Sequence, residues 1–367
     1  MPELEFLKVR MISYVILYRL ISPYKFLRVN FTGILVAGMK RFQKILATNR
    51  LSKYFPVPLA MLLASVIALP AKAQPVVAVS IAPVHSLVAG VMSGVAEPIL
   101  LIPATRSPHI QPLTPSAIKT VSAADLVVRI GAGYEVALKK ILGNLQTDNQ
   151  LELITAPSSM MLLTARSGGN WEPGHNEQQH DENQNDAIQA DSANLHTDPH
   201  IWLSAYNAAQ IVKLTRDRLI RIDSANKLRY ISNSNSMLKR LASFQMQLQR
   251  SLATIKNRPY VVLHDAYQYF EYEYHLTVVG SVSVDAQRKP GARRIRRLKD
   301  KIAKSGVTCI FLEPQLSSSM VDTLENDMDI SVGRLDPLGS DLDVGAQLWF
   351  GMMTNLAASL TSCLDPG

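Results

Sequence analysis

The chain has 367 residues, with 38 Lys and Arg against 30 Asp and Glu, for a formal net charge of +8. This excess is confined to residues 1–73, which hold eleven basic and two acidic residues, so the remaining chain holds 27 basic and 28 acidic residues and has a net charge of −1. The basic charge therefore gives no support to a nucleic-acid partner, and the length is sufficient for two domains.

The first segment has the features of an exported leader. Residues 39–73 contain the basic stretch "KRFQKILATNRLSKY", the apolar core "VPLAMLLASVIAL" and the cleavage motif "AKA", in the order of a secretory signal peptide. The core is shorter than the roughly 18 residues of a transmembrane helix, although an uncleaved membrane anchor is the alternative. We expect cleavage before Gln74; because the residue directly after the motif is Gln and not Cys, we expect a periplasmic protein without a lipid anchor. Residues 1–38 are either an extension upstream of a natural start at Met39 or an amphipathic segment at a membrane surface.

From residue 74 to residue 222, predicted strands and helices alternate. Runs rich in β-branched residues predict strands, and apolar residues at helical spacing predict helices. This alternation is typical of α/β units with a largely parallel sheet. The predicted strands cover 75–83, 97–104 and 125–131, and the predicted helices cover 85–95, 114–124, 134–145 and 204–221.

A polar segment at 166–197 interrupts this lobe, and a long helix follows it. The segment is rich in Asn, Gln, Asp and Glu, so we expect a mobile loop, in which His175, His180 and His196 are possible auxiliary metal ligands. Residues 224–255 have apolar side chains at helical spacing and contain no Pro or Gly. A helix of this length would span on the order of 45 Å at about 1.5 Å per residue, which suits a linker at 223–256 between two lobes.

The alternation resumes in the second lobe, at 257–367. The predicted fold is therefore α/β, with two similar lobes that contain mostly parallel sheets and are joined by one long helix. The predicted strands cover 259–264, 276–283, 307–315 and part of 330–339, and the predicted helices cover 266–274, 292–306, 320–329 and 344–364.

Three histidines occur in separate but similar settings. His109 in "SPHIQP", His200 in "TDPHIWLS" and His264 in "VVLHDAY" each adjoin an apparent strand end, as does Asp336 in "RLDPLGS". Ligands of open α/β sheets bind at the carboxyl ends of the strands. Neutral imidazole suits Zn²⁺, and three histidines leave a fourth tetrahedral position for a carboxylate or a water molecule. The pattern predicts a metal cleft, although Asp336 before Pro is equally typical of a turn.

The remaining candidates have simpler interpretations. His85 is expected to be structural, and Glu313, at a strand end, either supports the metal centre or caps a neighbouring element. The basic run at 288–301 is expected to be the solvated face of a helix. Cys309 and Cys363 are the only cysteines, and in an exported chain an even number predicts one disulfide, with two buried thiols as the alternative.

These motifs together resemble the high-affinity zinc-binding receptors of bacterial ABC transporters, the ZnuA type within the metal-binding cluster of solute-binding proteins. The resemblance covers essentially all of 75–367 and is carried by "SPHIQPLTPSAI", "AADLVVRIGAGYE", "DPHIWLS", "LHDAYQYFEYEYHL", "KPGARRIRRL", "VTCIFLEPQ", "LDPLG" and "SCL". It implies two lobes joined by a rigid helix, with zinc bound between them. The implied ligands are His109, His200, His264 and Asp336.

The resemblance has further implications. The cysteine pair of the family corresponds to Cys309 and Cys363, and its His-rich loop corresponds to 166–197, which here has only three histidines. Manganese and iron relatives usually have Glu where His264 stands, so the chain is similar to the zinc branch. We therefore expect a monomeric receptor, not an enzyme, that delivers zinc to a membrane permease with its cytoplasmic ATPase.

Three alternatives stay open. The first is a manganese or iron receptor of the same family. The second is a metal-dependent hydrolase, because catalytic zinc also has three protein ligands and an open position; however, the sequence contains neither HExxH nor G-x-S-x-G. The third is a surface adhesin, against which the missing lipid anchor argues.

Overall fold

The computed structural model describes residues 74–109, 112–143, 149–156, 159–166, 197–283, 291–316 and 329–365. The predicted leader, almost all of the polar segment and most of the helix predicted at 320–329 lie outside these ranges. Among the described residues, no helix is both long and apolar enough to cross a membrane.

The N-terminal half contains a four-stranded parallel sheet in the order β2-β1-β3-β4. Its strands are β1 (Val77–Ile81), β2 (Ile99–Ile102), β3 (Leu126–Arg129) and β4 (Gln150–Glu152). Every residue of β1 and β3 is buried, as expected for the central strands of a parallel sheet covered on both faces. The sequence pattern does not predict β4, a three-residue edge strand.

Helices cover both faces of this sheet. On one face lie α5 (Pro115–Ala123) and α6 (Val136–Leu142), and on the other lie α4 (Ala82–Met92) and α8 (Ala205–Ile222). Two of them begin next to the first residues of the helices predicted at 114–124 and 204–221, and those residues cap them. Thr114 accepts a hydrogen bond from the backbone N–H of Ala117 in α5, and Ser204 accepts one from Asn207 in α8.

The C-terminal half repeats the same topology. Its parallel sheet has the order β6-β5-β7-β8, so in each half the first strand lies between the second and the third. This confirms the predicted α/β fold with two similar sheets. The elements are β5 (Tyr260–His264), α10 (Gln268–Tyr274), β6 (Val278–Ser283), α11 (Ala292–Ser305), β7 (Cys309–Leu312), β8 (Ser331–Arg334) and α13 (Leu348–Leu364).

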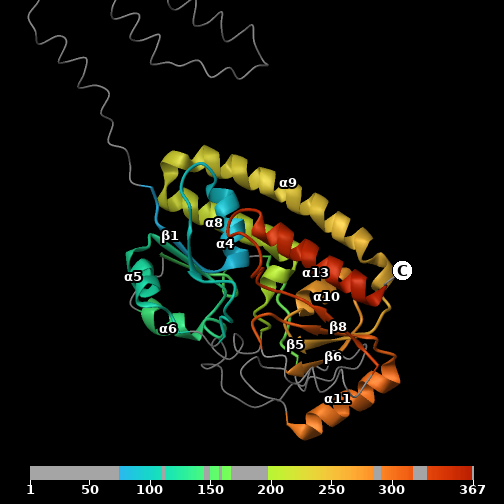
Figure 1. Cartoon of the computed structure of the whole chain (residues 1–367). Helices are drawn as coiled ribbons and strands as arrows, with labels where there is room; N and C mark the ends of the chain where they lie inside the picture. Colours follow the sequence, from blue (N-terminus) through green and yellow to red (C-terminus); the bar gives the residue numbers. More distant parts are fainter. Residues whose placement is uncertain are drawn as a thin grey trace, which may run out of the picture. The chain divides into compact units, whose positions relative to one another are not determined.

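A long helix, α9 (Lys227–Ser251), connects the halves (Figure 1). It is 25 residues long, and the 3₁₀ turns η3 (Ser224–Asn226) and η4 (Ala253–Ile255) occupy the ends of the segment predicted to be one continuous helix. The buried residues of α9 form one stripe, and the helix contacts α4, α8 and α13. The domain boundaries at 222 and 256 stay predictions.

The main hydrophobic core is shared by the two halves. It contains Val77 and Val128 from the first sheet, Val262 and Phe311 from the second, and buried side chains of α4, α8, α9 and α13. In Figure 1, α13 runs beneath α9, although it is the last element of the chain. The indole N–H of Trp202 donates to the carbonyl of Pro337 at 2.8 Å, which adds a hydrogen bond between the halves. The halves are therefore joined by packing as well as by α9.

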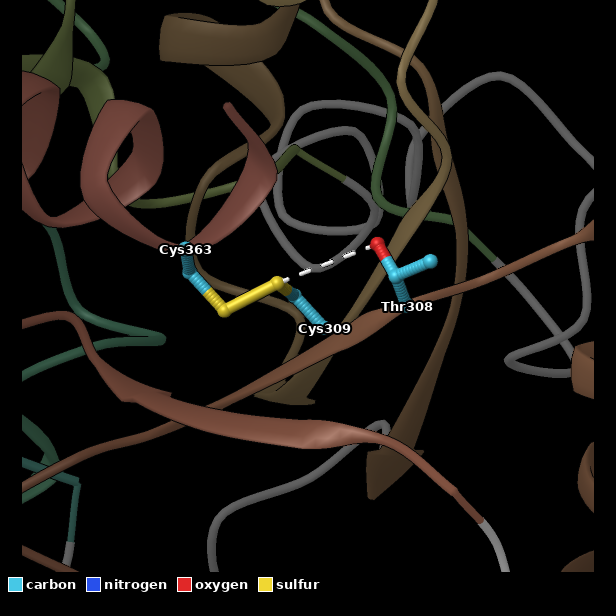
Figure 2. The surroundings of a disulfide bond; sticks show 3 residues. All are labelled: Thr308, Cys309 and Cys363. Carbon is cyan, nitrogen blue, oxygen red and sulfur yellow. Dashed lines mark hydrogen bonds between the residues drawn. A yellow bond between two sulfur atoms is a disulfide. The ribbon is translucent and has the colours of Figure 1, made fainter. Parts of the chain in front are cut away.

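The predicted disulfide is present. Cys309, the first residue of β7, is bonded to Cys363 in the last turn of α13 (Figure 2). The hydroxyl group of Thr308 lies 4.0 Å from the sulfur of Cys309. The bond ties the C-terminal helix to a central strand of the second sheet and closes a loop with a sequence separation of 54.

Candidate metal centre

His264 is the last residue of β5 and is buried. The central position of β5 in its sheet carries this side chain to the carboxyl edge, as the sequence predicts. Glu313 directly follows β7, the neighbouring strand, and both of its carboxylate oxygens lie 3.4 Å from Nδ1 of His264. The predicted supporting role of Glu313 therefore has a geometric basis in the pairing of β5 with β7.

His200 reaches the same place from an irregular segment. It precedes the 3₁₀ turn η2 (Ile201–Leu203) and does not adjoin a strand; the nearest β-structure is the isolated bridge between Thr164 and Thr197. The sequence interpretation of a strand end is therefore wrong for this residue. Asp198 fixes the side chain instead, because its carboxylate accepts hydrogen bonds from the backbone N–H of His200 at 3.0 Å and from Nδ1 at 2.7 Å.

His109 lies in the turn that follows β2 and is half-buried. The ring of Tyr134 packs edge-on against it, with ring centroids 4.6 Å apart, and also contacts His200. Tyr134 is itself buried in the N-terminal core. The turn is thus positioned by an aromatic side chain that sequence reasoning missed; "GAGYE" gives no direct signal of this contact.

The three histidines converge. One ligand atom of each lies within 4.8 Å of the others, and the ring centroids are 5.5 Å (His109–His200), 5.4 Å (His109–His264) and 5.1 Å (His200–His264) apart. Nitrogen atoms that bind one tetrahedral Zn²⁺ at about 2.0–2.1 Å lie about 3.3 Å from one another. A modest inward movement of the rings is therefore sufficient to close the set around one ion.

Outer carboxylates orient two of the rings. In His200 and His264 the Nδ1 atom faces a carboxylate, Asp198 or Glu313, which leaves Nε2 as the atom available to a metal. Carboxylate–histidine pairs of this kind set the tautomer and raise the basicity of metal-binding imidazoles. The Asp198 contact was missed, although an Asp two residues before the histidine is a readable signal.

Burial and neighbouring charges shift the pKa values of these groups. Desolvation, with the neighbouring imidazoles, holds the pKa of His109 and that of His200 well below the usual 6.5. Desolvation also acts on His264, but the carboxylates around it, Glu313 first, outweigh it and raise the pKa of His264. Burial raises the pKa of Asp198 to about 7. Two of the three candidate ligands therefore stay neutral, as metal binding requires.

Asp336 lies two residues beyond β8, as predicted, but its carboxylate is turned into its own loop. It accepts hydrogen bonds from the backbone N–H groups of Leu338, Gly339 and Ser340, from the Ser340 hydroxyl and from the side chain of Gln315. The group of candidate ligands found among the described residues contains the three histidines and not Asp336. Its role as a fourth ligand stays a prediction.

The other candidate residues lie elsewhere. His85 is buried in α4, where Nε2 lies 2.8 Å from the carbonyl oxygen of Pro98, in keeping with a structural role. The histidines of the polar segment, at 175, 180 and 196, lie outside the described residues, so their auxiliary role is untested.

Comparisons with known proteins place the chain in a family. Residues 77–363 match the model of ZnuA, described as zinc-uptake complex component A, periplasmic. A high-affinity zinc uptake system protein ZnuA from Brucella suis is 32% identical over 306 residues, which cover 79% of this chain and 91% of that protein.

Solved structures show the same fold. A crystal structure of ZnuA has a TM-score of 0.65 and 22% identity, covering 80% of this chain and all of that one. The periplasmic zinc binding protein TroA from Treponema pallidum has a TM-score of 0.63 and 18% identity, covering 80% of this chain and 99% of that one. With a family match over most of its length and a relative above 30% identity, the chain belongs to the ZnuA family, the periplasmic A component of zinc-uptake complexes.

Proposed function

We propose that this protein is a receptor that captures one Zn²⁺ ion in the periplasm and delivers it to the permease of an ABC transporter, which works with a cytoplasmic ATPase. The observation that carries the proposal is the convergence of His109, His200 and His264, from three distant segments, on one small site. Three neutral imidazoles form a donor set that suits zinc. The family match supports the same role.

The fourth position of the ion is open to Asp336 or to water. A carboxylate has about four lone-pair sites, and Asp336 already accepts five hydrogen bonds. Asp336 would therefore have to give up some of these hydrogen bonds in order to bind zinc. Water has no such cost. We therefore expect Asp336→Asn to weaken zinc binding much less than the loss of any of the three histidines. The histidines at 175, 180 and 196 are proposed as weak auxiliary ligands only.

Zinc is held and released by small movements under this proposal. The ligands come from both halves of the molecule, and those halves share a hydrophobic core and the hydrogen bond from Trp202 to Pro337. A wide hinge motion would have to break that core. The nitrogen atoms lie within 4.8 Å of one another and need to approach by no more than about 1.5 Å to reach the spacing of a tetrahedral site. We expect the radius of gyration in solution scattering to change little when zinc binds.

Export and assembly complete the proposal. The signal features at 39–73 would direct the chain to the periplasm, and cleavage near Gln74 would release it as a monomer without a lipid anchor. Catalysis is not part of this function, because the family is a substrate-binding receptor of an uptake system. A manganese receptor is the second candidate in the same family, but an all-imidazole set favours zinc over that oxygen-preferring ion.

The test is a calorimetric titration of metal-stripped residues 74–367 with zinc and with manganese. We expect one tight zinc site per chain and much weaker binding of manganese. His264→Ala should lose the tight site, because it removes the histidine that the C-terminal sheet contributes to the cluster. If the variant binds zinc as tightly as the parent chain, the proposed function of this site is wrong.

A further inference from the structure

Behind the three histidines lies a second, buried cluster of charges around Arg166. Its guanidinium donates to Asp265 at 3.2 Å and to Glu271 at 2.6 Å, and the side chains of the two carboxylates are only 6% and 2% exposed. Asp265 directly follows the candidate ligand His264, and Glu271 lies on α10. Glu271 also accepts a hydrogen bond of 3.4 Å from the hydroxyl of Tyr260.

The same arginine acts on the carboxylate that holds His200. Asp198 is buried, and the charge of Arg166 lowers its pKa against the larger opposing effect of desolvation. Hydrogen bonds near Asp198 also connect the residues that come before the polar segment with those that come after it. The backbone N–H of Asp198 donates to the carbonyl of Leu163, and the hydroxyl of Tyr269 donates to the carbonyl of Asp198.

Among the described residues, the guanidinium of Arg166 faces a group of buried carboxylates. Four buried carboxylates lie beside or behind His200 and His264, and Arg166 is the cation hydrogen-bonded to two of them. Arg294 also interacts electrostatically with Asp265, but its guanidinium donates to the carbonyls of Ser281 and Val282. Buried charges are stable only when they are compensated. The four carboxylates are Asp198, Asp265, Glu271 and Glu313.

We propose that Arg166 is a positioning residue of the metal centre that acts as the counter-charge of these carboxylates, a task that it shares with the bound divalent cation. Both cations compensate the same buried negative charge, so each stabilises the protein less when the other is present. Arg166 would therefore hold the site together before zinc arrives and limit the affinity once zinc is bound. This inference rests on the proposed zinc-binding function.

Two substitutions of opposite charge effect test the proposal, with melting temperature measured for metal-stripped protein and for protein in excess zinc. Arg166→Met should destabilise the metal-free protein more than the zinc-loaded protein. The folded variant should then bind zinc about tenfold more tightly, the order expected from removing one unit charge in a partly screened interior. Glu271→Gln removes a negative charge at nearly constant shape, so zinc should raise its melting temperature less than that of the parent chain. Arg166→Lys keeps the charge and should behave like the parent in this difference.

The outcomes separate the proposal from its alternatives. Equal losses with and without zinc in Arg166→Met would show that the arginine only anchors its segment, and a greater loss with zinc would show that it supports the bound geometry; either result overturns the proposal. If Arg166→Met folds only in the presence of zinc, the proposal stands. If it does not fold in either state, Glu271→Gln decides. A smaller zinc-induced rise in melting temperature than in the parent chain supports the proposal, and an equal or larger rise overturns it. His264→Ala is measured in parallel, because failure of the zinc-binding function would abolish the effect of zinc on the parent chain as well.

Discussion

The N-terminal and C-terminal sheets have the same strand order, but they present their histidines in different ways. In the N-terminal half, His109 and His200 lie in turns, and the carboxylate that orients His200 comes from two residues earlier in the chain. In the C-terminal half, His264 ends a central strand, and its carboxylate, Glu313, comes from the paired strand. His200 is thus fixed by a carboxylate that is close in sequence, and His264 by one that the pairing of two strands brings near. The disulfide and the ion pairs of Arg166 are further contacts between residues that are far apart in sequence, and each involves the C-terminal half.

The largest expected effect comes from removing one histidine from either half. His200→Ala and His264→Ala should each weaken zinc binding by about a thousandfold or more, because binding energies of roughly 10–16 kcal/mol are shared among a few ligands. His275→Asn is a matched control, since His275 has a left-handed backbone (φ 56°) that Asn tolerates. Competition with a chromogenic chelator measures the affinities. A much smaller loss for one histidine would show that only the other half holds the ion.

Removing the disulfide should affect the stability of the C-terminal half more than the metal centre. Replacing both Cys309 and Cys363 by Ala should lower the free energy of unfolding by about 2–4 kcal/mol, since the bond restricts a loop with a sequence separation of 54 in the unfolded chain. Denaturant unfolding of the metal-free protein measures this change. The zinc affinity of the folded variant should be nearly unchanged, and a large fall in affinity would mean that the bond itself shapes the site.

The orienting carboxylates should matter less than the ligands themselves. Loss of an outer partner of a metal-binding histidine typically costs about 10–100-fold in affinity. Asp198→Asn should reduce the zinc affinity by an amount near the upper end of this range, because Asp198 contacts Nδ1 of His200 at 2.7 Å. Glu313→Gln should reduce it by an amount near the lower end, because the contact of Glu313 to His264 is 3.4 Å long. Zinc titrations of both variants compare them directly. The reverse order would show that sheet register positions its ligand more firmly than the local turn does.

The dependence of zinc affinity on pH should follow the C-terminal histidine first. His264 has a raised pKa, so as pH falls it is the first ligand to take up a proton and compete with zinc. His109 and His200 have lowered pKa values and begin to compete only at lower pH. Affinity should thus be highest above the pKa of His264 and fall by about tenfold per unit below it. Glu313→Gln removes the main attraction that raises this pKa and should move the fall to lower pH; an unchanged profile would contradict this assignment.

The fold could be predicted largely because its signals are local. Buried β-branched runs and apolar residues at helical spacing predict most element positions, and the structure confirms them. The caps Thr114 and Ser204 lie at the starts of two of the predicted helices. The edge strand β4 was missed because three residues carry too little pattern. The ends of the long helix were wrong because propensity alone does not reveal the 3₁₀ turns around Lys227 and Ser251.

The metal centre could be predicted only in part. His264 and Glu313 follow from strand ends, and the motif around His200 contains its own carboxylate. In contrast, Arg166 meets Asp265 and Glu271 across 99 and 105 residues of chain, and only the tertiary fold creates such a contact. The hydrogen bonds that engage Asp336 are likewise formed by its folded loop and by Gln315, which sequence motifs do not reveal.

X-ray absorption spectroscopy at the zinc edge of the loaded protein tests the central claim most directly. The account predicts one zinc per chain with three imidazole nitrogens at about 2.0–2.1 Å and one oxygen ligand. His264→Ala should remove one imidazole from the spectrum. A parent spectrum with fewer than three imidazoles, or one that is unchanged in His264→Ala, would contradict a site built from both halves of the molecule.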